Sequence, residues 1–189
     1  STFKLFQYLS KRMLRLNHLQ VTNDSAITQR VEIMNEKVKY LLVPTCIVIL
    51  VDQVTKSLAV AKLEPNEPIM LLWTLQLNII RNSGASFSLG SNLTPYIASV
   101  AILASIGITY LALLESNRMT LSFYGIVLGG VLGNVIDRIA RTGDGFLGGK
   151  VVDFIDLQWW PIFNFADVAL VVGLPTVMFL RYREEKSYV

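Results

Sequence analysis

The sequence predicts an all-α integral membrane protein with four transmembrane helices, a small extracytoplasmic β-platform and an N-terminal amphipathic arm. Of the 189 residues, 52% are hydrophobic and only 16% are charged, and the mean hydropathy is +0.48. Ordinary soluble domains are less apolar than this. Four apolar segments are long enough to cross most of a bilayer core of about 30 Å. Polar residues gather near the ends of these segments, which indicates that this membrane protein has a functional site there.

The predicted arm covers residues 1–39. Apolar residues recur there at helical spacing, between lysines and arginines, at Phe3, Phe6, Leu9, Met13 and Leu16. This pattern is typical of a basic helix that lies on an anionic membrane surface. The lack of acidic residues before Asp24 is also typical of a targeting peptide. We favour the surface helix.

The four predicted spans cover residues 40–58, 95–114, 121–140 and 166–180. They form a predicted membrane domain of residues 40–183, which a cytoplasmic tail of residues 184–189 follows. Lysines and arginines are concentrated before the first span, between the second and third, and after the fourth. By the positive-inside rule, both termini are cytoplasmic and the connections 59–94 and 141–165 are extracytoplasmic.

The first extracytoplasmic connection predicts the β-platform. Residues 73–80 alternate in a way that favours a strand, and residues 81–90 predict a turn into a second short strand. Trp73, Trp159 and Trp160 are suited to the membrane interface. We therefore expect a small sheet on the membrane surface, with a plain structural hairpin as the alternative.

Each polar motif has a structural explanation of its own. Asp52 and Lys56 lie one helical turn apart and can pair. The sequence "GNVIDR" places Asn134 and Asp137 on one helical face beside Arg138, and would also suit glycine-assisted helix packing. In "FNFAD", Asn164 and Asp167 could form an acidic variant of the capping box.

Together, however, the motifs predict one shared site. All lie at the predicted outer ends of the spans, where charged groups cost at least a few kcal/mol each and usually face an interior cavity. No HExxH, GxSxG or phosphate-binding loop is present, and the one histidine, His18, lies in the arm. Carboxylates are therefore the predicted chemical groups.

Five motifs, "DQVTK", "NSGASFS", "GNVIDR", "VVDFI" and "FNFAD", occur in this order between the predicted spans. Over residues 40–183 the chain thereby resembles the lipoprotein signal peptidases (signal peptidase II), which are aspartyl peptidases of the bacterial inner membrane. The resemblance implies removal of the signal peptide from a diacylglyceryl-modified prolipoprotein, by cutting before the lipidated cysteine. It also implies no metal or organic cofactor, contact with membrane lipids, no nucleic acid, and a monomer.

The resemblance further assigns the site residues. The implied catalytic residues are Asp153 and Asp167. The implied substrate-binding or supporting residues are Asp52, Lys56, Asn82, Gly84, Asn134, Asp137, Arg138 and Asn164. Elementary electrostatics predicts the same chemistry, because two carboxyl groups in a partly dehydrated cleft share a proton and can act as acid and base. Asp167, at a helix N-terminus, is the expected anion.

Three alternatives stay open at this point. A small ion-coupled transporter or proton channel also uses intramembrane polar residues, although these would be spread over the membrane depth. A scaffold protein would use the motifs for helix packing alone. Within the peptidases, Lys56 could instead activate Ser83, Ser86 or Ser88 as a nucleophile.

Overall fold

The computed structural model describes residues 2–64, 66–84, 93–143 and 145–187, with the backbone alone for residues 2–26. The chain divides into a unit of residues 1–39 and a unit of residues 40–189. The first unit is helical from Thr2 onward, in agreement with the helix that the sequence predicts for the arm. The side chains that would make this helix amphipathic lie outside the described residues. The division into arm, membrane domain and tail stays a prediction.

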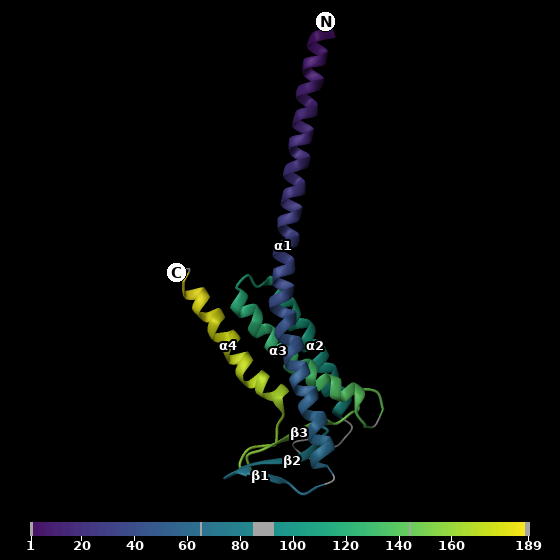
Figure 1. The fold of residues 1–189 in the computed structure, drawn as a ribbon, viewed down its shortest axis with the longest axis vertical. Helices are drawn as coiled ribbons and strands as arrows, with labels where there is room; N and C mark the ends of the chain where they lie inside the picture. The colour runs from purple at the N-terminus through teal and green to yellow at the C-terminus, as the bar shows by residue number, and fades with distance from the viewer. Residues whose placement is uncertain (1, 65, 85–92, 144, 188–189) are drawn as a thin grey trace. The chain divides into compact units, whose positions relative to one another are not determined.

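The described elements are four helices and three strands, drawn in Figure 1. They are α1 (Thr2–Leu63), β1 (Ile69–Leu72), β2 (Leu75–Asn82), α2 (Thr94–Leu114), α3 (Arg118–Ala140), β3 (Val151–Asp156) and α4 (Phe165–Ser187). Each helix contains a segment long and apolar enough to cross a membrane, namely Ile27–Leu63 in α1 and the whole of α2, α3 and α4. Together with the small sheet, these spans confirm the predicted fold class.

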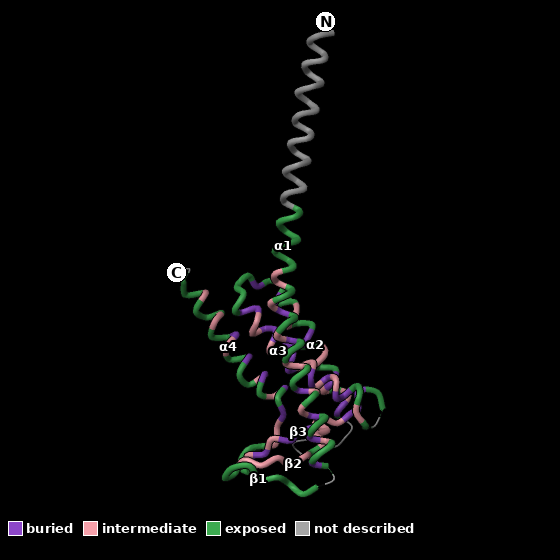
Figure 2. The backbone as a smooth tube through the Cα atoms, in the orientation of Figure 1, coloured by how far each residue is buried: buried purple, intermediate pink, exposed green. Residues whose placement is uncertain are grey.

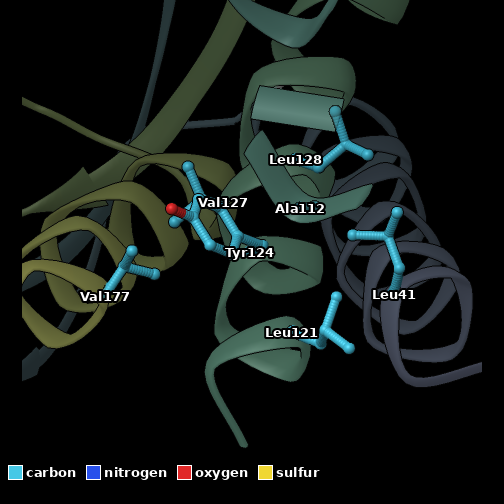
Figure 3. Close-up of a cluster of buried hydrophobic side chains, with 7 residues drawn as sticks. All are labelled: Leu41, Ala112, Leu121, Tyr124, Val127, Leu128 and Val177. Carbon is cyan, nitrogen blue, oxygen red and sulfur yellow. The ribbon is translucent and has the colours of Figure 1, made fainter. Parts of the chain in front are cut away.

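Helix α3 is the central helix of the second unit. In its apolar window 56% of the residues are buried, compared with 17% in α2 and 22% in α4. Residues three or four apart share one helical face, and Leu121, Tyr124, Val127 and Leu128 of α3 do so. They pack with Leu41 of α1, Ala112 of α2 and Val177 of α4 (Figure 3). Helix α3 thus packs against each of the other three helices.

Local sequence explains where two of these helices begin. Asn117 caps α3, because its Oδ1 accepts hydrogen bonds from the backbone N–H groups of Met119 at 2.8 Å and Thr120 at 3.2 Å. In α2, Pro95 occupies the first turn, where its missing N–H is not needed. The short connection of residues 115–117 therefore sets α3 directly after α2 in the bundle.

The sheet has the order β1-β2-β3, and both pairings are antiparallel. Strand β1 is exposed throughout, whereas β3 is buried from Val151 to Phe154 (Figure 2). The pairing of β2 with β3 sets Ile80 opposite Asp153 and Asn82 opposite Val151. The buried strand β3 is therefore the one that carries an aspartate into the interior.

The predicted strand at 73–80 is shifted in the structure. It begins at Leu75, because Trp73 has φ of 48° and belongs to the turn that joins β1 to β2. The partners of β2 are β1 and the later strand β3, which the sequence did not predict as a strand. Most of the second short strand expected within residues 81–90 lies outside the described residues.

Candidate active site

A buried ion cluster joins α1 to α3. The Lys56 ammonium lies 2.8 Å from Asp52 Oδ2, one turn away on α1, and 2.9 Å from Asp137 Oδ2 on α3. All three side chains have no exposed surface. Burying one of these charges alone would cost several kcal/mol, so they are stable only as a group. The predicted pairing of Asp52 with Lys56 is confirmed.

The same carboxylates attach the neighbouring elements. Asp52 Oδ1 accepts a hydrogen bond at 3.0 Å from the backbone N–H of Ala166, in the first turn of α4. Asp137 Oδ2 accepts one at 3.1 Å from the N–H of Val152 in β3. A Cβ on Gly133 would lie 2.7 Å from Asp52 Oδ2, so a glycine is required for this close approach. The cluster thus brings α4 and β3 together.

Helix α4 begins with the predicted capping box. The backbone N–H of Asn164 donates to Asp167 Oδ2 at 3.1 Å, and the N–H of Asp167 donates to Asn164 Oδ1 at 3.0 Å. Asn164 Nδ2 then donates to Asp153 Oδ1 at 2.6 Å. The cap is confirmed, and the residue that makes it also links Asp167 of α4 to Asp153 of β3.

Asp153 lies in an interior site, with only 3% of its surface exposed. Its Oδ2 accepts a hydrogen bond at 2.9 Å from Asn82 Nδ2 at the end of β2. Burial raises the pKa of Asp153 to about 6, and the negative charge of Asp167 acts in the same direction. The hydrogen bonds from Asn82 and Asn164 act against this increase. Asp153 is therefore a carboxyl group that holds a proton far more readily than an exposed aspartate.

Asn134 of α3 connects the ion cluster to Asp167. Its Oδ1 accepts hydrogen bonds from Lys56 Nζ at 2.9 Å and from Asn164 Nδ2 at 3.2 Å. Because the carbonyl side faces these two donors, the amide NH₂ points at Asp167, and Nδ2 lies 2.9 Å from Asp167 Oδ1. Both oxygens of Asp167 thus accept hydrogen bonds, one from Asn134 and one from the cap.

Gly84 and Arg138 complete the predicted set. Gly84 has φ of +86°, a conformation that favours glycine, and its N–H donates to Asn82 Oδ1 at 2.7 Å, which turns the Asn82 NH₂ toward Asp153. Arg138 is 8% exposed, and Nη2 lies 3.6 Å from the position of a Cβ on Gly84. Its buried Nη1 has no hydrogen-bond partner in the described part of the chain. The structure therefore gathers all the predicted site residues in one region, while their catalytic roles stay predictions.

Comparison with known proteins identifies the family of this site. The family model for signal peptidase II matches residues 44–182. The chain belongs to the signal peptidase II family. It is 39% identical over 128 residues to a lipoprotein signal peptidase of Rhodococcus jostii, covering 67% of this chain and 64% of the relative. It is 38% identical over 138 residues to that of Mycolicibacterium smegmatis, covering 72% of this chain and 58% of the relative.

The chain thus spans less than two thirds of the length of these two relatives. The lipoprotein signal peptidase of Mycobacterium tuberculosis is 36% identical over 138 residues, with 72% and 68% coverage. Two solved structures of bacterial membrane enzymes superpose with a TM-score of 0.63 each. They are 25% and 26% identical, and the alignments cover 77% and 74% of this chain and 88% and 90% of theirs. Family and fold agree.

In this signal peptidase II chain, the structure adds one polar residue, Gln53, that the sequence did not predict as part of the site. Gln53 Nε2 donates to the Gly133 carbonyl at 3.0 Å and contacts both carboxylates of the ion cluster.

Asp156 lies outside this site. Its Oδ2 accepts a hydrogen bond from Gln76 Nε2 at 2.6 Å, and this bond lowers the Asp156 pKa. Asp153 and Asp156 are three residues apart, so a strand directs them to opposite faces. A strand predicted at residues 151–156 would therefore have indicated from the sequence that Asp153 and Asp156 face different surroundings.

The serine and lysine alternative is not supported by the geometry. A lysine ammonium has three N–H donors, and the Lys56 ammonium contacts three acceptors, on Asp52, Asp137 and Asn134. No donor or lone pair is left to activate a serine. Ser86 and Ser88 lie outside the described residues. Within the described chain, no group of three or more His, Cys, Asp and Glu residues is arranged to hold a metal ion.

Proposed function

We propose that this chain is a membrane-embedded aspartyl endopeptidase that removes the signal peptide from diacylglyceryl-modified prolipoproteins, by cutting before the lipidated cysteine. The names of its relatives support this substrate class. The observation that carries the proposal is the coupling of Asp153 and Asp167 through Asn164 at the end of the helix bundle. Transport is less well supported, because the buried charges of α1 and α3 gather around this one cluster, and Glu115, buried at the end of α2, is paired with Arg181.

In the proposed mechanism, Asp153 is the acid and Asp167 is the base. Asp167 takes a proton from a water molecule, whose oxygen attacks the carbonyl carbon of the scissile peptide bond. Asp153 donates its proton to the carbonyl oxygen, which gives a tetrahedral diol and leaves Asp153 ionised. Asp167 then gives its proton to the amine nitrogen while ionised Asp153 takes a proton from a diol hydroxyl, so the C–N bond breaks and a carboxylic acid and an amine leave. The pair then holds one proton again, and no covalent intermediate forms.

The amide contacts support this division of roles. Asp167 accepts hydrogen bonds at both oxygens and lies at the N-terminus of α4, where the helix dipole favours an anion. Asp153 is buried on β3 with a raised pKa, which suits a proton donor. The other predicted residues hold this arrangement in place. Arg138, with a donor left over in the described part of the chain, is the residue available to bind substrate.

The proposal is tested by cleavage of a diacylglyceryl-modified prolipoprotein by the purified protein in detergent, with the unmodified precursor as the control. Cleavage should be confined to the modified form. Because Asp153 must carry a proton to act as the acid, kcat/KM should fall as the pH rises through about 6. Absence of cleavage of the modified form would contradict the proposed function itself.

A variant tests the assignment of the acid. Asn82→Ala removes a hydrogen bond that stabilises ionised Asp153, so the pKa should rise further. The alkaline limb of the plot of kcat/KM against pH should therefore move to higher pH. The charges of Asp167, Arg138 and Lys56 still act on Asp153 in this variant. Gln76→Ala, which removes a partner of Asp156, is the control and should leave the limb in place. A limb that does not move with Asn82→Ala would contradict Asp153 as the acid.

We further propose that both termini are cytoplasmic, that the site lies near the extracytoplasmic face of the bacterial inner membrane, and that the protein acts as a monomer among membrane lipids. The exposed side chains of Trp73, Trp159 and Trp160 at the sheet end support an interfacial position. In a Cys46→Ser background, an impermeant thiol reagent should label Glu67→Cys in intact cells but not Lys186→Cys. Labelling in the reverse sense would contradict this topology.

A further inference from the structure

A groove runs along α4 from the carboxylate of Asp167. It has a volume of about 360 Å³ and lies between α4 and the segment that joins β3 to α4. The α4 wall includes Val168, Val171 and Val172, and the opposite wall includes Trp159 and Trp160. Apart from Asp167, every side chain that lines it is aliphatic or aromatic. One predicted catalytic group thus lies at the edge of an apolar channel.

The wall that includes Trp159 and Trp160, here called the tryptophan wall, is held by hydrogen bonds at both ends. Asp156 Oδ1 accepts a hydrogen bond at 2.7 Å from the N–H of Gln158, just before the tryptophans. Beyond them, Phe163 and Ile155 exchange backbone hydrogen bonds of 3.0 and 2.9 Å. A wall fixed at each end forms the groove before any ligand arrives, as is usual for binding sites.

The α4 wall leads from the site into the lipid-facing surface. Asp167, Val168, Val171 and Val172 share one side of the helix. Val171 is 71% exposed and Val172 is 54% exposed, within a helix that is apolar enough to span a membrane. The groove is therefore continuous with the surface that meets the hydrocarbon of the bilayer.

We propose that this groove receives an acyl chain of the diacylglyceryl group of the substrate. The inference rests on the proposed function. Backbone groups along α4 are engaged within the helix, so an extended peptide in the groove would find no partners for its N–H and C=O groups on that wall. An acyl chain has no such groups beyond its ester. The chemistry of the walls matches a hydrocarbon.

Distance along the substrate favours the same occupant. The lipid is attached to the side chain of the cysteine directly after the scissile bond, so its acyl chains begin a few bonds from the reacting carbonyl. The apolar segment of a signal peptide is separated from the cut by a short region of about three residues. Those residues span up to about 10 Å when extended. A groove that starts at a reacting carboxylate is therefore nearer to the lipid than to the signal-peptide helix.

The test uses one prolipoprotein peptide with either two palmitoyl or two acetyl chains on its glyceryl group. Val171→Trp should block the groove one helical turn beyond Asp167, which only the long chains reach. We expect kcat/KM for the palmitoyl substrate to fall at least about tenfold, as for the loss of a well-filled apolar subsite, and kcat/KM for the acetyl substrate to stay the same. Val100→Trp on α2, where Val100 is 65% exposed, is the matched control and should change neither.

Equal losses on both substrates, or no loss, would overturn the groove assignment. A loss that depends on the apolar segment of the signal peptide, and not on the acyl chains, would assign the groove to that segment instead. Trp159→Ala, which opens the opposite wall, provides a second variant and should lower the preference for palmitoyl over acetyl. Failure of the wild-type protein to cleave either substrate would instead contradict the proposed function.

Discussion

Asp153→Asn and Asp167→Asn should each abolish cleavage of a diacylglyceryl-modified prolipoprotein, with kcat lowered by at least about a thousandfold. Asparagine keeps the size of the side chain, and in both positions it can keep part of the hydrogen bonding to Asn164. It cannot release or accept the proton that acid-base hydrolysis needs, and proton transfer by a positioned group contributes about 10² to 10⁴ in rate. The measurement is single-turnover cleavage by purified variants that unfold at the wild-type temperature.

Asp156→Asn is the matched control for this comparison. Asp156 lies on the same strand and is also buried, but its partners are Gln76, Asn78 and Gln158, and none of them contacts the aspartate pair. We expect its kcat to fall by no more than about tenfold, because only a loop position is disturbed. Substantial cleavage by either Asp153→Asn or Asp167→Asn, with an inactive Ser83→Ala enzyme, would replace the aspartyl mechanism with a serine mechanism.

Lys56→Met should destabilise the folded protein by about 3–5 kcal/mol, because it leaves the buried Asp52 carboxylate without its ion-pair partner and leaves Asp137 paired with Arg141 alone. Methionine fills a similar volume, so the loss arises from charge and not from a cavity. Asn134 would also lose the donor that orients its amide toward Asp167. The free energy of unfolding in detergent, measured by chemical denaturation, gives the magnitude.

Arg81→Met is the control for Lys56→Met. It also removes one cation from an ion pair, but Arg81 and Glu64 are 32% and 44% exposed. Exposed pairs contribute about 1 kcal/mol or less, since water already solvates both groups. Equal destabilisation by the two substitutions would mean that the Lys56 cluster is open to water and is not the connection between α1 and α3 described above.

Several features could be predicted from residues close together in the sequence. Hydropathy alone indicates the four spans, because the bilayer requires long apolar segments whatever their partners are. The pairing of Asp52 with Lys56 and the capping box of Asn164 and Asp167 each involve residues within about one helical turn. For such contacts the helix itself brings the side chains together.

Other features depend on residues far apart in the sequence, and the tertiary structure decides them. Asn82 reaches Asp153 across 71 positions because β2 pairs with β3, a strand that the sequence alone did not predict. Lys56 reaches Asn134 across 78 positions, and that contact sets which side of the amide faces Asp167. The sequence by itself determined a four-span membrane protein with carboxylates near its helix ends. Only the packing of α1, α3, β3 and α4 decided how Asp153 and Asp167 differ, because burial and amide orientation depend on neighbours from other elements.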